Sequence, residues 1–512
     1  MKILMVQSPC WVVYTPPYNL ALLKAICKKE RHRVICLDFN IKFYNYLVGR
    51  EEQYIYDNST NWYDENYVKE IINKYPEFID ECIDEILKYP TRVIGFTITG
   101  LSRFFSEEIA KRIKLRDKSK IIIFGGPHCF KNELGEQILS NCPYVDVICY
   151  LEGEEVLPRL LDIIEQNNKI ESLTGIAFRK KEEVIETSDI ELIKDLNNLP
   201  FADFSDFNLS EYTEQELPIA TSRGCINRCL FCSESRIWGK YRFRNSENIY
   251  AEIKQQLSQY PFIKSFFFND SLLNGNVKML DELCDLLIKN KINISWGGQA
   301  TIREEMTKEL ILKMKRAGFS HVSYGLESAS PRILKMIGKR FTPELAERVI
   351  RHTKKAGIRT DVNIIIGFPT ENEEDVITTA NFLKRNKKFI DEIFFHPLVV
   401  SRGSYYYENK DRLGIEFENE FNPNSWYSTK EENNLDKRLE ILKFYKSYIG
   451  NKGESFFTLG NYYLFIADAN FNKGDYKNAL LYYKRAKEVN KSRLKNPSIR
   501  DKIKQAQDKI RE

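Results

Sequence analysis

The 512-residue sequence has no run of about 18 apolar residues, which is the minimum that a membrane-spanning helix needs. The apolar start of the chain ends after Val6, too early for a signal peptide, and it predicts a buried first strand instead. Charge of one sign is not in excess either, because 77 basic residues face 72 acidic ones. This near balance argues against nucleic acid as a partner. Without an export signal the 11 cysteines are expected to stay reduced. The sequence therefore predicts a cytoplasmic protein with no membrane span.

Short apolar runs alternate with amphipathic segments from residue 1 to about residue 190. Strands are expected at 34–37, 93–96, 121–124 and 145–148, and helices at 20–29 and 106–115. This alternation predicts a first domain over residues 1–190, an α/β domain with a doubly wound parallel sheet. Ligands of such sheets bind at the carboxyl ends of the strands. The loop Gly125-Gly126-Pro127-His128 directly follows one of these strands.

Residues 191–217 contain several Asp and Asn residues with Pro200, and they are expected to form a linker. A second alternating region occupies 218–410. Strands are expected at 219–221, 266–268, 322–324 and 363–366, and helices at 276–289, 308–317 and 343–356. Repeated strand–helix units without a Gly-rich Rossmann fingerprint favour a full or partial TIM-type (β/α) barrel.

The last segment, residues 411–512, is helical in pattern and strongly charged. Gly474-Asp475-Tyr476, followed by Ala479, Tyr483 and Ala486, resembles the second half of a tetratricopeptide repeat. One such repeat cannot bury its own apolar face. The helices are therefore expected either to pack on the barrel or to dock a protein partner, and both interpretations stay open.

Three cysteines, Cys225, Cys229 and Cys232, have the spacing C-x3-C-x2-C on one predicted loop. Three thiolates can satisfy three irons of a cubane cluster and leave the fourth iron open for a ligand. Structural iron–sulfur and zinc sites normally have four protein ligands. The alternative is a structural zinc ion whose fourth ligand is His128 or another cysteine.

This cysteine loop, placed after a first barrel strand, resembles the signature of the radical S-adenosylmethionine superfamily. The resemblance implies a 4Fe–4S cluster on the three cysteines, with S-adenosylmethionine bound at the open iron. One electron would then cleave S-adenosylmethionine into methionine and a 5′-deoxyadenosyl radical. It further implies an electron donor such as flavodoxin or ferredoxin, and it places the aromatic ring of Phe231 beside the cluster.

The similarity extends over roughly residues 215–410. Asp270 ends the second predicted strand, where the family contacts the methionyl amino group, although the usual Gly-Gly-Glu is absent here. Gly325-Leu326-Glu327-Ser328 resembles the fourth-strand motif, which implies that Glu327 and Ser328 reach the ribose or the carboxylate. The segment 363–369 resembles the part of the fifth strand beside adenine, which implies roles for Ile365 and Gly367.

Residues 1–190 resemble the cobalamin-binding domain that precedes the barrel in one class of the superfamily. The matching segments are Pro16-Pro17-Tyr18-Asn19-Leu20-Ala21, Gly125-Gly126-Pro127-His128 and Glu152-Gly153-Glu154-Glu155. The resemblance implies that Gly125, Gly126 and His128 contact cobalamin. The motif Asp-x-His-x-x-Gly, which supplies a histidine to cobalt, is absent. His32 is expected to be solvated in a charged turn, so His128 is the better binding-loop residue.

This class implies a cobalamin-dependent methyltransferase that acts on an unactivated carbon or phosphorus of a small-molecule or peptide substrate. Ring closure or rearrangement, with or without cobalamin, is the first alternative. Candidates for substrate contact, from their predicted places at strand ends, are Tyr324, Arg303 and His396, and Tyr324 is equally compatible with the core.

Two further hypotheses come from other classes of protein. A methylthiotransferase would share the barrel but would need a second cysteine trio, for which Cys10, Cys36 and Cys129 are scattered candidates. Its RNA-binding β-barrel does not fit the helical C-terminal pattern. A non-enzymatic tetratricopeptide-type scaffold stabilised by zinc would explain the C-terminal segment but gives the two strand–helix regions no role.

Overall fold

The computed structural model describes residues 1–48, 59–129, 131, 134–181, 183–417, 425–430, 433–450, 467, 470–471, 474–489 and 497–511. The chain forms two compact units. Unit 1 comprises residues 1–226, 234–299 and 313–320, and unit 2 comprises residues 227–233, 300–312 and 321–512. These units do not coincide with the predicted domains, whose boundaries stay a prediction.

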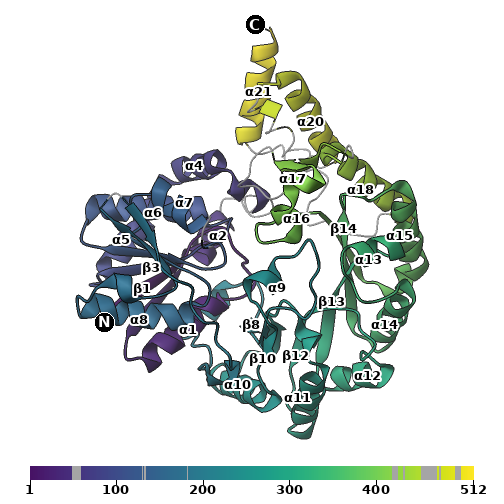
Figure 1. Ribbon diagram of the computed structural model, residues 1–512, viewed down its shortest axis with the longest axis horizontal. Helices are drawn as coiled ribbons and strands as arrows, with labels where there is room; N and C mark the ends of the chain where they lie inside the picture. Colours follow the sequence, from purple (N-terminus) through teal and green to yellow (C-terminus); the bar gives the residue numbers. More distant parts are fainter. Residues whose placement is uncertain are drawn as a thin grey trace. The chain divides into compact units, whose positions relative to one another are not determined.

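Unit 1 contains a seven-stranded sheet with the strand order β2-β1-β3-β4-β5-β6-β7 (Figure 1). Its strands are β1 (Lys2–Gln7), β2 (Arg33–Asp38), β3 (Val93–Thr97), β4 (Ile121–Gly125), β5 (Val147–Cys149), β6 (Ile176–Lys180) and β7 (Glu183–Glu186). The first five are parallel, as predicted. The sheet is nevertheless mixed, because β6 and β7 add an antiparallel hairpin at one edge that the sequence analysis did not predict. The order 2-1-3-4-5 reverses direction between β1 and β3, which is where such sheets bind ligands.

Helices cover this sheet in two groups, which explains why strands such as β3 are buried at every residue. Helices α1 (Tyr18–Lys29) and α8 (Gly153–Glu165) pack against each other. Helix α6 (Arg103–Arg116) packs against α4 (Glu65–Lys74) and α5 (Pro76–Lys88). The core on the side of α4, α5 and α6 is built around aromatic rings, including Phe43, Phe78, Phe105 and Phe124. Helices α2 (Phe39–Val48) and α7 (Leu134–Asn141) complete the connections.

Residues 191–217, the predicted linker, pack onto unit 1 rather than spanning a gap. They include the short helices η3 (Leu196–Asn198) and η4 (Leu209–Glu211). The Tyr212 hydroxyl donates to Asp38 at 2.8 Å, and the Asp206 carboxylate pairs with Lys24 at 2.6 Å. The segment is therefore part of the folded structure of unit 1.

A second set of parallel strands in unit 1 consists of β8 (Glu216–Ile219), β11 (Ser265–Phe268) and β12 (Ser295–Ala300). Helices α10 (Ser246–Gln259) and α11 (Val277–Lys289) pack together beside them. The segment after β8 forms a two-residue antiparallel ribbon of β9 (Ser222–Arg223) and β10 (Arg242–Phe243). The short helix α9 (Glu234–Ile237) lies between β9 and β10 in the sequence.

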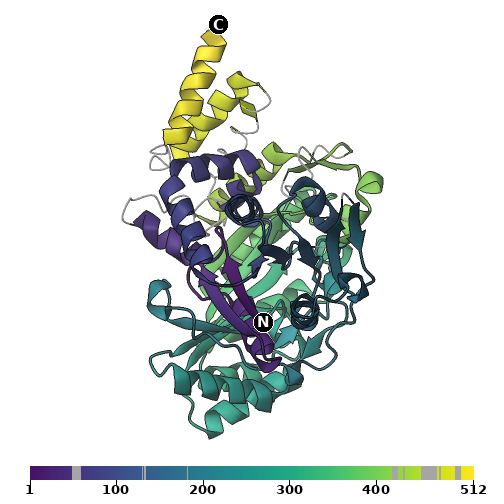
Figure 2. The same ribbon diagram turned by 90° about the vertical axis from the view of Figure 1, so that its left-hand side faces the viewer.

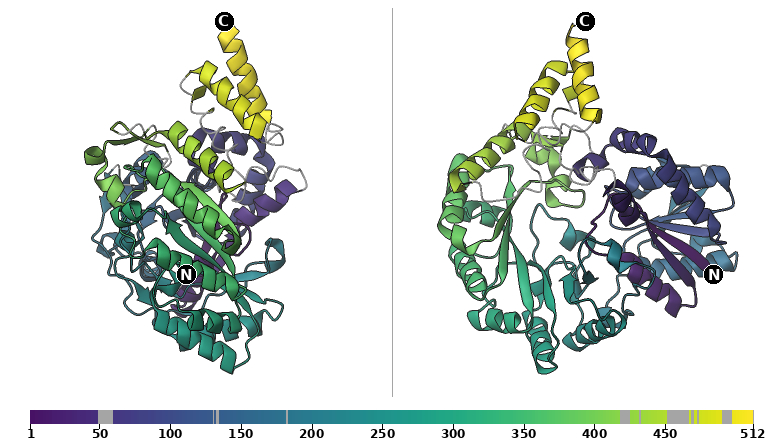
Figure 3. Two further views of the ribbon diagram at one scale, coloured as in Figure 1. Left: turned by 90° about the vertical axis from the view of Figure 1, so that its right-hand side faces the viewer. Right: turned by 180° about the vertical axis from the view of Figure 1, so that it is seen from behind.

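Unit 2 contains the parallel strands β14 (Arg359–Ile366) and β15 (Glu392–Pro397) and most of β13 (Phe319–Glu327) (Figure 3). The helices of unit 2 here are α13 (Pro331–Met336), α14 (Pro343–Lys355) and α15 (Glu373–Asn386), while α12 (Lys308–Arg316) is divided between the two units. Capping side chains define several starts: Thr342 caps α14, and Asn372 forms a capping box with Asp375 on α15. The predicted alternation of strand and helix is confirmed, whereas barrel closure stays a prediction.

The C-terminal segment of unit 2 is mainly helical, as predicted. It contains α16 (Tyr405–Glu408), α17 (Lys410–Leu413), the hairpin β16 (Ile415–Phe417) and β17 (Trp426–Ser428), then α18 (Leu435–Ile449), α20 (Tyr476–Val489) and α21 (Pro497–Arg511). Helices α20 and α21 lie side by side (Figure 2). Ala479, Tyr483 and Ala486 of α20 are buried in one cluster with Leu439 of α18. This contact supports packing within the unit, and the repeat assignment itself stays a prediction.

Among the described residues, none of the helices combines the length and the apolar character that a membrane crossing needs.

Candidate active site

A cavity of about 600 Å³ lies in unit 1 at the carboxyl ends of the parallel strands. The lining residues at or just after the ends of β1, β3, β4 and β5 are Gln7, Thr97, Thr99, Gly125, Gly126, Cys149 and Leu151. The same cavity is lined by Ser222, Arg223 and Gly224, which lead directly into Cys225. The switch point between β1 and β3 and the start of the cysteine loop therefore share one cavity.

The loop after β4 approaches the backbone after β3 too closely for any residue but glycine. Gly126 has φ +112°, and a Cβ placed there would lie 2.9 Å from both the nitrogen and the oxygen of Ile98. Gly125 has no such restriction, because its Cβ would be 3.6 Å from the Cβ of Cys149. His128 donates its backbone N–H to the Ile98 carbonyl at 3.1 Å, and its side chain is not among those that line the cavity. The structure thus brings Gly125 and Gly126 to the cavity but not His128.

The cavity wall combines aromatic rings with amide side chains. The rings belong to Trp11, Tyr14, Tyr18, Phe96, Trp238 and Phe267, and the amides to Gln7, Asn19, Asn269 and Gln299. Asn19 donates to the Thr97 hydroxyl at 2.7 Å, which fixes one amide at the end of β3. Aromatic walls with a few placed amide groups are typical of sites for small molecules and cofactors.

Asp270 anchors the backbone that leads into the cysteine loop. It is buried, and its carboxylate accepts hydrogen bonds from the backbone N–H and the hydroxyl of both Thr221 and Ser222. Burial raises the pKa of Asp270 to about 6, although these hydrogen bonds act in the opposite direction. The predicted contact with the methionyl amino group stays a prediction, because the described contacts of this carboxylate go to the loop.

The next residue, Arg223, is held by two carboxylates. One guanidinium nitrogen donates to Glu152 and another to Glu154. Burial lowers the pKa of Arg223, but Glu154 and Glu152 outweigh it, so the net pKa lies above the usual value. Arg242, opposite Arg223 in the β9–β10 ribbon, also donates to Glu152, at 2.9 Å. Sequence analysis marked Glu152 and Glu154 only as part of a segment, without a role.

The cysteine loop begins at Gly224, whose φ of +76° favours glycine. Cys225 and Cys232 are partly exposed, whereas Cys229 is buried. Within unit 2, the Leu230 N–H donates to the Ile337 carbonyl at 3.2 Å. The Phe231 ring lies 6.0 Å from the ring of Phe368, between centroids. The apolar residues between the second and third cysteines therefore anchor this half of the loop.

The fourth-strand motif is buried and internally bonded. Glu327 has φ +64° and pairs with Lys339 at 3.1 Å, and the Lys339 ammonium also donates to the Gly325 carbonyl. The Ser328 hydroxyl is fully buried and lies 3.1 Å from the Thr379 hydroxyl. The predicted S-adenosylmethionine contacts of Glu327 and Ser328 stay predictions.

The fifth-strand segment is held from the C-terminal part of unit 2. Asn433 donates its amide to the carbonyls of Gly367 and Phe368, at 3.0 and 3.1 Å. The Gly367 N–H donates to Glu371, and a Cβ on Gly367 would lie 2.6 Å from Cγ of Arg438. Ile365 is partly buried in the same unit, against the cluster that includes Phe368. Sequence reasoning missed Asn433 and Arg438, because no local pattern relates them to a strand about 65 residues earlier.

The three substrate-contact candidates differ in their surroundings. Tyr324 is fully buried, and its hydroxyl lies 3.0 Å from the hydroxyl of Thr353 on α14, so the structure supports the core interpretation. Arg303 pairs with Glu305 at 2.6 Å. His396 lies 3.1 Å from the Asn363 amide oxygen, and burial lowers its pKa to about 4, so it is neutral near pH 7. Their roles stay predictions.

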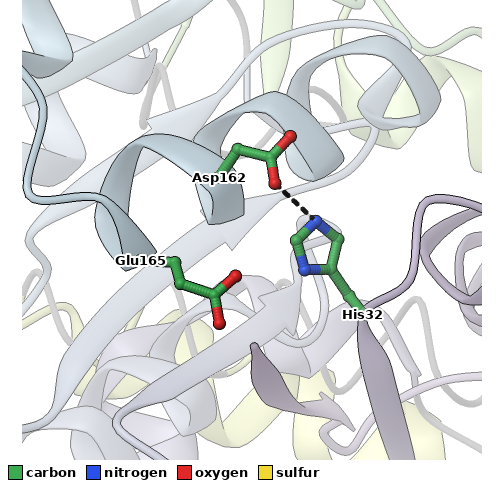
Figure 4. Close-up of side chains that lie close together, drawn as sticks. All are labelled: His32, Asp162 and Glu165. Atoms are coloured by element: carbon green, nitrogen blue, oxygen red, sulfur yellow. Dashed lines mark ion pairs between the residues drawn. The ribbon is translucent and has the colours of Figure 1, made fainter.

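The expectation that His32 is solvated is wrong. Only 4% of His32 is exposed, and its Nε2 lies 3.4 Å from Asp162 (Figure 4). His32, Asp162 and Glu165 are the one group among the described residues whose three potential metal ligands lie within 4.8 Å of one another. The Met1 amino group contacts both Glu165 and His32 Nδ1 at 3.0 Å, and both carboxylates are more than half exposed. We interpret the group as an ion-paired end of α8.

Comparison with known proteins supports the same region. Residues 219–383 match the model of the Radical SAM superfamily. An uncharacterized methyltransferase of Pyrococcus horikoshii is 30% identical over 305 residues, which cover 59% of this chain and 65% of that protein. The anaerobic magnesium-protoporphyrin IX monomethyl ester cyclase of Cereibacter sphaeroides is 27% identical, over 59% of this chain and 50% of that protein. The chain thus spans between half and two thirds of these two relatives.

Two solved structures show the same fold over most of the chain. The cobalamin-dependent S-adenosylmethionine radical enzyme OxsB, with aqua-cobalamin bound, has a TM-score of 0.66 at 16% identity and matches 92% of this chain and 68% of OxsB. The radical S-adenosylmethionine methyltransferase TsrM from Kitasatospora setae, with cobalamin and a 4Fe–4S cluster bound, has a TM-score of 0.60 at 16% identity and matches 81% and 75%. Residues 219–383 therefore match the Radical SAM superfamily, and most of the chain has the fold of the solved structures of OxsB and TsrM.

Proposed function

We propose that the protein is a radical S-adenosylmethionine enzyme with a 4Fe–4S cluster on Cys225, Cys229 and Cys232. We further propose that it is a cobalamin-dependent methyltransferase that acts on an unactivated carbon or phosphorus. One observation carries the proposal: a single cavity is lined by the ligand-binding end of the N-terminal sheet and by the residues that precede Cys225. Methyl transfer between two cofactors and a substrate requires such a shared space.

The residues of the loop fit a cluster with one open iron. Three thiols are the donor set, and iron–sulfur clusters are held by cysteine thiolates. Cys225 and Cys232 are partly exposed, so the loop is accessible to a ligand. Asp270 and Arg223 fix the backbone that enters the loop, and Leu230 fixes its second half.

The cavity also fits cobalamin. Gly126 has no Cβ, which would otherwise meet the backbone of Ile98, so the loop after β4 can lie against the end of β3. Amide side chains such as Asn19 and Gln7 can pair with the amide groups at the rim of the macrocycle, and rings such as Trp238 supply apolar area. Among the described residues that line the cavity none is a histidine, and we propose binding without a protein histidine on cobalt.

When bound, the reduced cluster supplies the electron that cleaves S-adenosylmethionine, and cobalamin supplies the methyl group. The protein's own contribution is to position these groups and to exclude water. We propose that Glu327, Ser328, Ile365 and Gly367 line the S-adenosylmethionine site, with Phe231 beside the cluster. A reductant such as flavodoxin or ferredoxin is required, and the substrate is a small molecule or a peptide.

Ring closure is a second candidate, because the relative from Cereibacter sphaeroides is a cyclase. The two reactions leave different products from S-adenosylmethionine. A methyltransferase of this type consumes one molecule as methyl donor and leaves S-adenosylhomocysteine, in addition to 5′-deoxyadenosine. A cyclase leaves 5′-deoxyadenosine without stoichiometric S-adenosylhomocysteine.

The test is anaerobic incubation of the reconstituted, reduced protein with methyl-labelled S-adenosylmethionine and a metabolite extract. Formation of both nucleoside products, with label in a new compound only when cobalamin is supplied, supports the methyltransferase. 5′-Deoxyadenosine without labelled product supports the cyclase. A Cys229→Ala variant that still forms 5′-deoxyadenosine at the wild-type rate would refute the cluster assignment.

A further inference from the structure

Glu152 is a fully buried carboxylate at the start of α8, yet it does not cap that helix. Its two oxygens accept from Arg223, from Arg242 at 2.9 and 3.0 Å, and from the backbone N–H of Ile193 at 2.6 Å. Glu154, two residues further on and the second residue of α8, accepts from the other guanidinium nitrogen of Arg223. All of these groups belong to unit 1.

The β9–β10 ribbon explains why two carboxylates are needed. Arg223 and Arg242 are register partners in this ribbon, so two guanidinium groups lie next to each other. Like charges placed opposite each other across strands are destabilising. Both side chains are at least 85% buried, which weakens solvent screening. Glu152 lies between them and Glu154 adds a second negative charge, so the four residues form a neutral network.

This network is attached to the cysteine loop by a short stretch of chain. Arg223 is two residues before Cys225, and the intervening Gly224 has no side chain of its own to anchor. Glu154, Arg223 and Gly224 all line the cavity. The segment that follows β5 therefore contacts the chain just before the loop, in addition to the contacts that Asp270 makes with Thr221 and Ser222.

We propose that Glu152 and Glu154 are positioning residues for the cysteine loop, acting through the Arg223 guanidinium. This inference rests on the proposed function and adds a role to it. The start of α8, in the N-terminal part of the chain, holds Cys225 in place through Arg223. The loop keeps its cluster because two neighbouring elements clamp its entrance, Asp270 at Thr221 and Ser222, and the glutamate pair at Arg223. If Arg223 lost its contacts with Glu152 and Glu154, only Asp270 would hold the start of the loop.

The test compares Glu154→Gln and the double variant Glu152→Gln/Glu154→Gln with a matched control, Glu107→Gln. Glu107 pairs with the buried Arg103 at 2.7 Å within α6, so the control removes a comparable ion pair in the same unit outside the cysteine loop. Each reconstituted protein is challenged anaerobically with an iron chelator, and iron release is followed in time. Hydrogen exchange of residues 221–226 and the thermal midpoint are measured on the cluster-free proteins.

We expect iron release at least five-fold faster in both loop variants, with faster exchange at 221–226, and release within two-fold of wild type in Glu107→Gln. Arg223→Lys, which keeps the charge but loses the two-pronged contact, should resemble Glu154→Gln. Equal rates of iron release and of hydrogen exchange at 221–226 in Glu154→Gln and Glu107→Gln would overturn the inference. This comparison remains decisive if the double variant fails to fold. A wild-type protein that takes up no iron would instead overturn the proposed function.

Discussion

Replacing Gly126 by alanine tests whether the loop after β4 is built for close approach. The residue has φ +112°, and the new Cβ would lie 2.9 Å from two backbone atoms of Ile98, which cannot rotate away. Backbone strain of this kind costs about 1–3 kcal/mol. A thermal midpoint shifts by about 2–4 °C per kcal/mol in a domain of 150–250 residues, so we expect the midpoint to fall by roughly 2–12 °C, in the lower half of that range because this unit is larger.

The same change should weaken cobalamin binding. The loop after β4 can move away from Ile98 to relieve the strain when the cavity is empty, but it must return to its original position when cobalamin binds. If about 1–2 kcal/mol of strain is restored on binding, affinity falls by about 5–30-fold. The assay is equilibrium dialysis of hydroxocobalamin together with a thermal melt.

The matched control for this test is Gly125→Ala, since Gly125 lines the same cavity but its Cβ would meet Cys149 only at 3.6 Å. Its stability should stay within about 0.5 kcal/mol of wild type, as for substitutions that create no specific defect. Equal cobalamin affinity and equal midpoints for the two variants would refute the close-approach argument.

Three further predictions concern single residues. Burial raises the pKa of Asp270 from 3.8 to about 6. As the pH rises from about 4 to about 6, the unfolded chain loses this proton before the folded protein does, so the stability of the wild type falls. At 1.36 kcal/mol per pKa unit, the folding stability of Asp270→Asn relative to wild type should rise by up to about 3 kcal/mol as the pH rises across that window. A difference in thermal midpoint between the two proteins that does not change with pH would contradict this. Gly367→Ala would place a Cβ 2.6 Å from Arg438 at φ +87° and so displace a segment that we propose lines the S-adenosylmethionine site. The affinity for S-adenosylmethionine, measured by dialysis, should fall at least about five-fold, and an affinity equal to that of wild type would contradict the proposed site. Tyr324→Phe removes one buried hydrogen bond to Thr353, so it should cost about 1 kcal/mol and leave turnover unchanged, whereas a tenfold loss of turnover would argue for a catalytic role.

The parallel strands were predictable because strands buried on both faces leave continuous apolar runs, as at 121–124. The edge hairpin β6–β7 was not, because charged residues such as Lys180 and Glu183 interrupt its apolar positions. The segment 191–217 has the composition of a linker, but Tyr212 and Asp206 make specific contacts that composition does not reveal.

The cysteine loop was predictable from spacing, since its three ligands are adjacent in the sequence. The residues that hold it were not, because Glu152 and Asp270 reach Arg223, Thr221 and Ser222 from about 50 to 70 residues away. Short polar motifs at strand ends also predict a site without showing which way a side chain points. Tyr324 illustrates this, because it faces α14 and is buried there.

We propose that the three-cysteine loop holds a 4Fe–4S cluster and that the cavity beside Arg223 and Gly224 holds cobalamin. The most direct test is anaerobic reconstitution with iron, sulfide and hydroxocobalamin, followed by desalting, a visible spectrum and metal analysis. We expect about four iron and four sulfide per chain with a broad iron–sulfur band, plus near-stoichiometric cobalamin. About one zinc with neither iron nor cobalamin would contradict it.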